Sequence, residues 1–325
     1  MQKKCRRMHI GTDCSGTDAP SYGLRATKLH KEGHIKIVHE WACNTCPAAK
    51  QFIALNHKPK VFFDNIKWRR HEKLKPVHIY TCGFPCQNWS CAGKMLGWED
   101  PRMAVYRAMM KTLKTASIQS FILENVPRLL THNQGKTIAK IVKRLKECGF
   151  FVKYRVYNTL DFGLPQHRRR LYIVGLRGGE PSLPDALVVK TAPISKFLEK
   201  HKARLGTMPT GKRARQNLKK VIKHMKATGA SMKQSWVVDV DASERFLQGK
   251  LNCSPTVTRA RALGFWVTIH NRRMSAVEQF RLQGFPVDEI VALQSRTNMG
   301  RLAGNCMSVP ALTHMLDSLL PKLGF

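Results

Sequence analysis

Short apolar runs of strand length alternate with stretches of helical periodicity through the first half of the chain. The clearest helix is expected at residues 138–148, where apolar residues recur at helical spacing and Gly149 supplies a stop. Further helices are expected at 20–31 and 104–116, and strands at 9–14, 35–41, 60–66, 78–82, 121–126, 151–157 and 171–176. This alternation predicts an α/β fold with a mostly parallel sheet that helices cover on both faces.

The pattern changes near Gly178. Residues 178–193 are rich in glycine and proline, which is typical of a linker. Regular order returns at residues 275–283, where a Ser-x-x-Glu capping box opens an apolar stretch. Pro310 then opens a final apolar helix.

Basic residues greatly outnumber acidic ones. The 325 residues include 56 Lys and Arg against 21 Asp and Glu, a formal net charge of +35, so a large polyanion is the expected partner. A solvated basic surface is one alternative. An anionic membrane is the other, and it is disfavoured because no lipidation signal or clear membrane anchor supports it. Residues 196–226 carry eleven of the basic residues and one acid, and the apolar positions within 218–225 predict a short amphipathic helix.

The ten cysteines are scattered along the chain, which indicates reduced thiols in an intracellular compartment rather than a disulfide framework. Cys43 and Cys46 form a Cys-x-x-Cys pair. No second pair completes the four ligands of a structural zinc ion, so no metal site is expected. A redox role for this pair is the alternative.

Polar loops follow the first three expected strands, where open α/β sheets bind their ligands. The first loop, residues 13–19, contains Gly16, which permits a tight turn against a ligand. Glu40 is expected near the end of the second strand, at a separation from Gly16 that suits an acid holding a ribose, and Asp64 near the end of the third. The three loops together indicate a nucleoside-bearing cofactor. The alternative is that these acids only cap helices.

Reactive residue types follow the later strands. Cys86 lies just beyond the fourth strand beside Pro85, as an exposed nucleophile would, although many cysteines are simply buried core residues. Glu124 lies where the fifth strand leaves the core and is a candidate proton donor or a helix cap. Arg168 and Arg170 fall on one face of a strand and suit anionic or carbonyl oxygens.

Six segments occur in the order and spacing of a known family. They are DxSGT at 13–17, GFPCQ at 83–87, ENV at 124–126, QxRxR at 166–170, RLQGFP at 281–286 and GN at 304–305. On these segments the chain resembles the DNA (cytosine-5)-methyltransferases over nearly its whole length, except about residues 180–255. The resemblance implies a class I, Rossmann-like catalytic domain at 1–178 completed by 300–325. It also implies a small target-recognition domain at 179–299 that includes the basic insert 196–226.

The resemblance implies roles for individual residues. Cys86 would be the nucleophile, Glu124 would contact N3 and the exocyclic amine of a flipped-out cytosine, and Arg168 or Arg170 would contact its O2. S-adenosyl-L-methionine, released as S-adenosyl-L-homocysteine, would be bound by Asp13, Cys14, Ser15, Gly16, Thr17, Glu40, Trp41, Asp64, Asn65, Ile66, Pro85, Asn305, Ser308 and Val309. Double-stranded DNA would be contacted by Gln87, Ser90 and Arg259 and, on the charge argument, by Lys212, Arg213, Arg215, Lys219 and Lys220.

The implied reaction transfers a methyl group to carbon 5 of cytosine. The Cys86 thiolate adds to carbon 6, carbon 5 takes up the methyl group, and loss of the C5 proton and of the thiolate restores the ring. Because the ring is stacked inside a duplex, the base must first be flipped out, at a cost of roughly a few kcal/mol. Cys14, Asp18 and Ala19 depart from the aromatic and glycine residues that are usual in the family's first loop.

Two other functions stay open at the level of sequence. One branch of the family modifies transfer RNA, but its Cys-Phe-Thr signature differs from the Cys-Ser-Pro-Thr-Val-Thr at 253–258. A catalytically inactive DNA-binding regulator would have lost the nucleophile or the acid, whereas Cys86 and Glu124 are both present. We expect a monomeric enzyme without a membrane segment, in the nucleus if the source is eukaryotic and otherwise in the cytoplasm.

Overall fold

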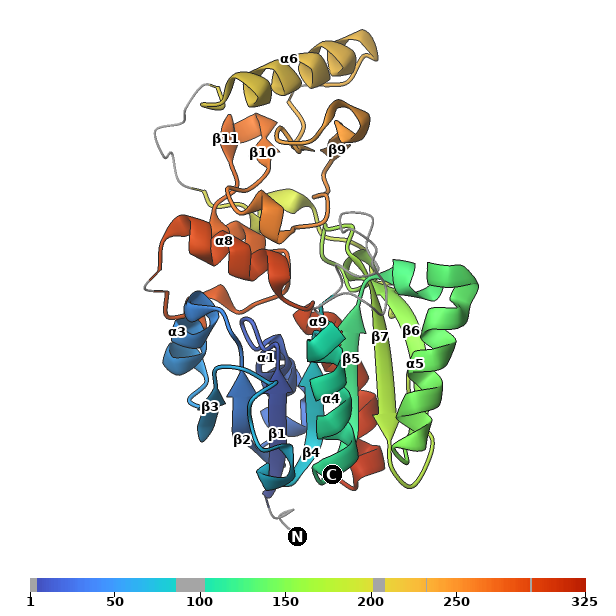
Figure 1. Ribbon diagram of the computed structural model, residues 1–325. Helices are drawn as coiled ribbons and strands as arrows, with labels where there is room; N and C mark the ends of the chain where they lie inside the picture. Colours follow the sequence, from blue (N-terminus) through green and yellow to red (C-terminus); the bar gives the residue numbers. More distant parts are fainter. Residues whose placement is uncertain (1–4, 86–102, 201–207, 232, 293) are drawn as a thin grey trace. The chain divides into compact units, whose positions relative to one another are not determined.

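A computed structural model describes residues 5–85, 103–200, 208–231, 233–292 and 294–325 (Figure 1). The predictions for Cys86, Gln87 and Ser90 lie outside these residues. The chain divides into two compact units. The large unit comprises Met1–Tyr157, Arg169–Ala186 and Met307–Phe325, and the small unit comprises Asn158–Arg168 and Leu187–Cys306.

A seven-stranded sheet of order β3-β2-β1-β4-β5-β7-β6 forms the centre of the large unit (Figure 1). Its strands are β1 (Arg6–Asp13), β2 (Ile35–Cys43), β3 (Val61–Phe63), β4 (Val77–Cys82), β5 (Ile118–Asn125), β6 (Phe151–Asn158) and β7 (Arg169–Leu176). The neighbours from β3 to β5 are paired in parallel, whereas β7 runs antiparallel to β5. The predicted mostly parallel sheet is therefore confirmed.

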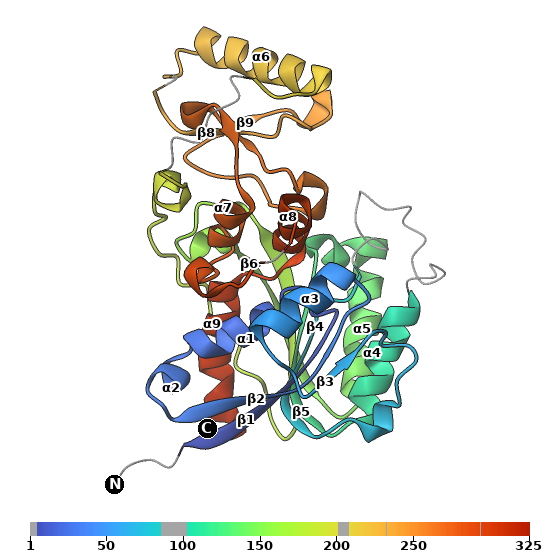
Figure 2. The same cartoon turned by 90° about the vertical axis from the view of Figure 1, so that its left-hand side faces the viewer.

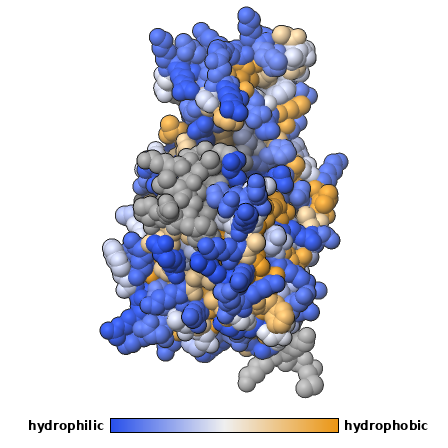
Figure 3. Space-filling view, turned by 45° about the vertical axis from the view of Figure 1, so that its right-hand side comes forward, coloured by the Kyte–Doolittle hydropathy of each residue, from blue (hydrophilic) through white to orange (hydrophobic). Residues whose placement is uncertain are grey.

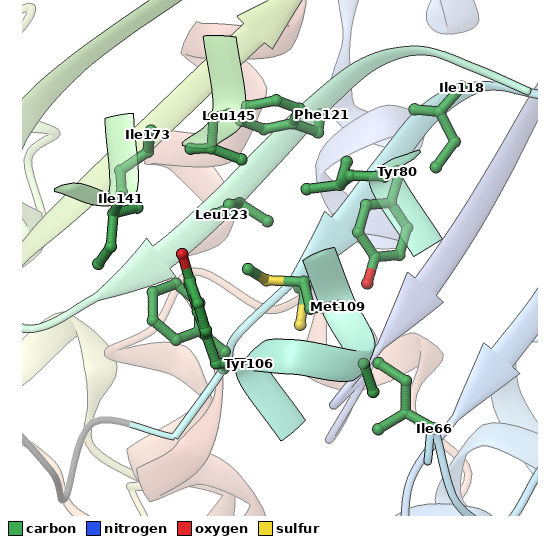
Figure 4. Close-up of a cluster of buried hydrophobic side chains, with 14 of the residues drawn as sticks. Ile66, Tyr80, Tyr106, Met109, Ile118, Phe121, Leu123, Ile141, Leu145 and Ile173 are labelled. Atoms are coloured by element: carbon green, nitrogen blue, oxygen red, sulfur yellow. The ribbon is translucent and has the colours of Figure 1, made fainter. Parts of the chain in front are cut away.

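Helices cover both faces of this sheet (Figure 2). On one face lie α1 (Ala19–Ala26) and α9 (Val309–Leu319), which pack closely against each other. Gly23 permits this close packing, since a Cβ atom at its position would lie only 3.0 Å from Cβ of Leu312. On the other face lie α4 (Met103–Thr115) and α5 (Lys136–Glu147). Between these two helices and the strands lies the apolar cluster of Figure 4, and complete burial of each large side chain in it contributes about 1.5–3 kcal/mol.

Two helices of the large unit differ from the prediction. The helix expected at 20–31 is split into α1 and α2 (Lys28–Lys31), because Thr27 adopts an extended conformation and its hydroxyl donates to the Leu24 carbonyl at 2.6 Å. Helix α3 (Pro47–Asn56) was not predicted, because its buried face consists of only Ala49, Phe52 and Ile53 and gives a weak apolar pattern.

The small unit contains a four-stranded sheet of order β11-β10-β8-β9. Its strands are β8 (Trp236–Val238), β9 (Gly249–Leu251), β10 (Trp266–Val267) and β11 (Arg272–Arg273), and its helices are α6 (Lys212–Ala227), α7 (Ala276–Arg281) and α8 (Arg296–Asn305). The amphipathic helix expected within 218–225 is confirmed as part of the longer α6. The capping box of Ser275 and Glu278 is confirmed at the start of α7.

The two units differ in their boundaries from the predicted domains at 1–178 plus 300–325 and at 179–299. Residues 158–168 belong to the small unit, where the Gln166 side chain donates to the Leu282 carbonyl at 2.7 Å and accepts from the Val257 amide at 2.9 Å. The chain returns to the large unit at Met307 rather than at 300, because α8 packs tightly on residues 258–262 of the small unit.

Short 3-10 segments connect the longer elements: His71–Lys73, Pro127–Leu130, His132–Gly135, Thr159–Asp161, Ile194–Phe197, Glu244–Phe246, Arg259–Arg261, Thr268–His270, Val287–Glu289 and Leu320–Leu323. All eight cysteines in the described part of the chain are free thiols. Across the same residues, none of the helices combines the length and the apolar character that crossing a bilayer requires.

Candidate active site

The first loop leaves the carboxyl end of β1 in a sharply turned conformation. Cys14, Gly16 and Asp18 have positive φ angles of 50°, 58° and 53°, in the left-handed region that non-glycine residues rarely adopt. Ser15 holds the turn in place, because its hydroxyl lies 2.8 Å from that of Thr12 and accepts from the Cys43 amide at 3.2 Å. Such a strained and well-anchored turn is typical of a ligand-binding loop.

The carboxylate of Asp13, which precedes this turn, is fully engaged by protein groups. Both of its oxygens accept from the Arg69 guanidinium at 2.5 Å, and the Tyr80 hydroxyl donates to Oδ2 at 2.6 Å. Arg69 also donates to the Thr112 hydroxyl at 2.9 Å. The side chains of Asp13 and Arg69 are 0% and 1% exposed. The Asp13 carboxylate is therefore a buried structural group that anchors the start of the first loop.

Sequence reasoning missed Arg69. It lies in the basic run Trp68-Arg69-Arg70-His71, which resembles an ordinary solvated segment, and its partner is 56 residues away in the sequence. The one local sign is that Ile66, three residues earlier, is an isolated apolar position that the structure buries.

Glu40 does not lie at the end of the second strand, contrary to the prediction. Strand β2 continues to Cys43, and Glu40 is the extra residue of a bulge, because Ile10 pairs with His39 and Gly11 with Trp41. The Glu40 carboxylate lies 2.6 Å from Nδ1 of His9 and accepts from Lys60 at 2.8 Å. Burial alone would raise the pKa of Glu40, but these two contacts outweigh it and lower that pKa below its usual value.

Trp41 belongs to the core of the sheet rather than to its edge. Its ring is 1% exposed and covers Gly11, where a Cβ atom would approach the indole to 2.2 Å. The strand positions that reach the carboxyl edge beside Asp13 are Cys43 on β2 and Cys82 on β4. The structure therefore places Glu40 within β2, in contact with His9 and Lys60, and Trp41 in the core.

The third loop follows β3 and combines one exposed, one half-buried and one buried residue. The Asp64 carboxylate is 76% exposed and pairs with Lys50 at 2.8 Å. The Asn65 side chain accepts from the Lys67 amide at 3.0 Å, which closes a local turn, and Ile66 is buried. This loop and the first loop are tied together by the Asp13–Arg69 pair.

The fourth loop is described as far as Pro85, the residue before Cys86. Asn125, at the end of β5, is buried and donates to the Phe84 carbonyl at 3.2 Å. The Phe84 ring is buried against Tyr106 with a centroid separation of 6.0 Å. The chain that leads into Cys86 is therefore fixed by β5 and α4.

Glu124 and Arg170 form an ion pair beside this loop. Nε of Arg170 lies 3.0 Å from Oε1 of Glu124, and each side chain is 15% exposed. Oε2 of Glu124 lies toward Gly83, where a Cβ atom would be 3.9 Å from it. One carboxylate oxygen is thus held by an arginine while the other faces the loop three residues before Cys86.

Arg168 is placed differently from Arg170, although sequence alternation predicts one shared face. The Arg168 guanidinium belongs to the small unit, where it is buried and donates to the carbonyls of Val257 and Cys306 at 2.6 Å and of Gly304 at 3.4 Å. These bonds connect main-chain segments of the small unit. Arg170, rather than Arg168, is the arginine that the structure brings to Glu124.

The remaining predicted residues are divided between the units. Ser308 and Val309 open α9 in the large unit and are buried. Asn305 is the exposed last residue of α8 in the small unit, and Arg259 is exposed at the start of a 3-10 segment there. The five predicted cations of α6 are all exposed in the small unit.

Comparison with known proteins identifies the family. A family model described as C-5 cytosine-specific DNA methylase matches residues 14–320. The chain belongs to this family. It is 34% identical over 251 residues to the type II methyltransferase M.NgoBI of Neisseria gonorrhoeae, and the aligned region covers 75% of each of the two chains. It is 32% identical over 249 residues to the type II methyltransferase M.HaeII of Haemophilus aegyptius, and the aligned region covers 76% of each of the two chains.

Solved structures of methyltransferases share the fold. The Entamoeba histolytica methyltransferase EhMeth superposes with a TM-score of 0.71 at 15% identity and covers 98% of this chain and 99% of its own. The Dnmt2 methyltransferase of S. pombe superposes with a TM-score of 0.69 at 17% identity, over 98% of this chain and 100% of its own. These likenesses confirm the class I methyltransferase fold, and the family model confirms the expected DNA cytosine-5 methyltransferase.

The site has features that fit the S-adenosylmethionine of this family. Thr17 Oγ1 and Ser308 Oγ are buried and have no hydrogen-bond partner among the described residues, whereas buried polar atoms are normally paired. Around Gly16 the space is open, since a Cβ atom there would meet nothing within 4 Å. Two unpaired hydroxyls and a bare glycine on the large unit suit a ligand rich in amine, carboxylate and hydroxyl groups.

The buried thiols of the sheet edge do not suit nucleophilic attack. Burial raises the pKa of Cys82 and of Cys43 well above the usual value for a thiol, so neither forms the reactive thiolate readily. By contrast, the loop that contains Cys86 begins at the carboxyl end of β4, next to Glu124. The described thiols at the ends of β2 and β4 are therefore poor candidates for a nucleophile.

Proposed function

We propose that this protein transfers a methyl group from S-adenosylmethionine to carbon 5 of cytosine in double-stranded DNA. The reaction proceeds through a covalent bond between Cys86 and carbon 6 of a base flipped out of the helix. The observation that supports this proposal is the Glu124–Arg170 pair, held beside the loop that leads directly into Cys86.

Cys86 makes carbon 5 reactive. Addition of its thiolate to carbon 6 forms an S–C6 bond and turns carbon 5 into the nucleophilic carbon of an enamine. When bound, S-adenosylmethionine supplies the electrophilic methyl group that carbon 5 takes up. A base then removes the C5 proton, the S–C6 bond breaks, and its electron pair returns to Cys86 as the aromatic ring is restored.

Glu124 handles the charge that develops on the base during the addition. Its Oε2 faces the Cys86 loop and is available to hold or donate the proton at N3, while Oε1 is occupied by Arg170. Arg170 fixes the orientation of the carboxyl group and is a candidate donor to the cytosine O2. Arg168 acts in this scheme only as a structural residue, because its guanidinium is occupied by carbonyls of the small unit.

The cofactor is proposed to be held by the first loop, by Asn65 and Ile66, and by Ser308 and Val309. Thr17 and Ser308 are the side chains with unpaired buried hydroxyls, and Gly16 leaves room for the ligand. Glu40 and Trp41 are left out of this set, because the first is engaged by His9 and Lys60 and the second lies in the core.

Covalent trapping tests this function. A duplex that carries 5-fluorocytosine is incubated with the protein and S-adenosylmethionine, and the adduct is digested and mapped by mass spectrometry. Fluorine cannot leave as a proton does, so the adduct is expected to persist on Cys86. Cys86→Ser should form no adduct and still bind the cofactor, whereas the control Cys82→Ala, at a buried thiol, should be trapped normally.

Three results would contradict the proposal. An adduct on Cys82 or Cys91 would assign the nucleophile elsewhere. Trapping on fluorinated transfer RNA but not on duplex DNA would identify an RNA methyltransferase. Tight binding of duplex DNA without any adduct would identify an inactive DNA-binding regulator.

A further inference from the structure

Helix α6 is fixed to the small unit along one face. Ala214, Leu218, Val221 and Met225 are buried and pack with Val238, Val240 and Trp266. The amide of Asn217, on the same face, donates to the carbonyls of Val240 and Ala242 at 2.9 and 3.0 Å. The helix is therefore a rigid platform and not a loose basic tail.

Five cations form a stripe on the opposite face of α6. Lys212, Arg215, Lys219, Lys223 and Lys226 are all exposed. Because successive helical residues are rotated by about 100°, these five positions fall within an arc of roughly 80° and extend over about 21 Å. We call this set the cation stripe.

No carboxylate neutralises the cation stripe within the described part of the chain. Helix α6 itself contains no Asp or Glu. The acidic residue paired with this helix is Glu244, which binds Lys220 at 2.6 Å, and Lys220 lies outside the stripe. Arg215 donates to the Thr210 carbonyl at 2.8 Å, which fixes its side chain and leaves its charge unopposed.

The spacing of the stripe matches a charged polymer. Neighbouring cations are three or four residues apart, hence about 4.5–6 Å along the helix axis. A DNA strand carries one phosphate charge per ~3.4 Å of duplex axis, so a stripe of about 21 Å passes several phosphates. The surface at the top of Figure 3, where α6 lies, is mostly hydrophilic, as a phosphate contact requires.

We propose that the cation stripe binds the phosphate backbone of the duplex DNA substrate, independently of base sequence. This inference rests on the proposed function for the identity of the polyanion. It revises the set expected from sequence, since Lys223 and Lys226 join the contact while Arg213 and the Glu244-paired Lys220 lie outside it. Phosphate contacts position a protein on DNA and carry no sequence information.

The test compares two variants of equal charge in the full chain. The stripe variant replaces Lys212, Arg215, Lys219, Lys223 and Lys226 by Gln, which keeps helix propensity. The control variant replaces five exposed lysines of α4 and α5 in the large unit by Gln: Lys111, Lys114, Lys136, Lys143 and Lys146. Circular dichroism and thermal unfolding first establish that both variants fold as the parent does.

DNA affinity is then measured by fluorescence anisotropy against salt, on several unrelated duplexes. Each phosphate contact contributes about −0.9 to the slope of log affinity against log salt, so loss of the five contacts should make the slope shallower by up to about 4.5. Its affinity should fall by a similar factor on every duplex, at least tenfold at 0.1 M salt, while the control keeps the parent slope. An unchanged slope, an equal loss in the control, or an altered sequence preference would each overturn the proposal.

Methyl transfer by the unmodified protein separates this proposal from the proposed function. An active parent whose salt slope does not depend on the stripe would refute the stripe alone. A parent whose slope depends on the stripe but which methylates no DNA would refute the proposed function alone.

Discussion

Replacing Arg69 by Met should destabilise the large unit strongly. The substitution removes two hydrogen bonds to Asp13 and one to Thr112. It leaves the Asp13 carboxylate at 0% exposure with Tyr80 as its remaining donor in the described structure. Removal of one partner from a buried ion pair costs about 3–5 kcal/mol, mostly because the other charge stays buried without compensation.

Urea unfolding followed by circular dichroism measures this cost. Arg69→Met should lower the free energy of unfolding by about 3–5 kcal/mol. The neighbouring Arg70 is exposed, so Arg70→Met is a matched control that should change it by less than about 0.5 kcal/mol. The double variant Asp13→Asn with Arg69→Met should be more stable than the sum of the single changes predicts, by about 0.5–3 kcal/mol, because no buried charge is then left alone.

The same variants test the link between the pair and the cofactor loops. Asp13 lies at the start of the first loop, and Arg69 lies a few residues after Asn65 and Ile66. Arg69→Met and the double variant should therefore both bind S-adenosylmethionine more weakly. If Arg69→Met cost less than about 1 kcal/mol, or if Arg70→Met cost as much, the buried network would be refuted.

Three further predictions concern the site. Glu124→Gln should lower kcat at least tenfold, since general acid-base groups contribute about 10²–10⁴, and near-normal turnover in a single-turnover assay would remove Glu124 from the chemistry. Arg170→Lys should lower kcat with little change in the cofactor KM, and a selective rise in that KM would contradict its place beside Glu124. Burial lowers the pKa of His57 to about 4, while Nδ1 accepts from Arg25 and Nε2 donates to the Thr17 carbonyl. The free energy of unfolding should therefore fall by about 2–3 kcal/mol as pH drops from 6.5 to 4, since the unfolded state gains the proton first, and His57→Gln should flatten this pH dependence.

Much of the fold could be predicted from local sequence patterns. The apolar runs predicted all seven strands of the large sheet within a few residues. The signal is clearest for the central strands, which are largely buried and apolar on both faces. The Ser275–Glu278 capping box and the apolar stripe of α6 were also predicted correctly, since both depend on residues three or four apart.

The errors came from contacts between distant residues. Glu40 was expected at the end of a strand, but a bulge and two partners from β1 and from the approach to β3 hold it inside the sheet. Arg168 and Arg170 are two residues apart, yet the first is occupied by carbonyls 89 to 138 residues away and the second by Glu124. Strand alternation fixes the face of a side chain and not the partner that it finds there.

The identity of the methylated nucleoside most directly tests the proposed methyl transfer to carbon 5 of cytosine. The purified protein is incubated with duplex DNA and isotopically methyl-labelled S-adenosylmethionine, and the DNA is hydrolysed and analysed by mass spectrometry. We expect the label in 5-methyldeoxycytidine, and its loss in Cys86→Ser. Label in a base methylated on an exocyclic nitrogen, or label that enters transfer RNA and not DNA, would contradict the account.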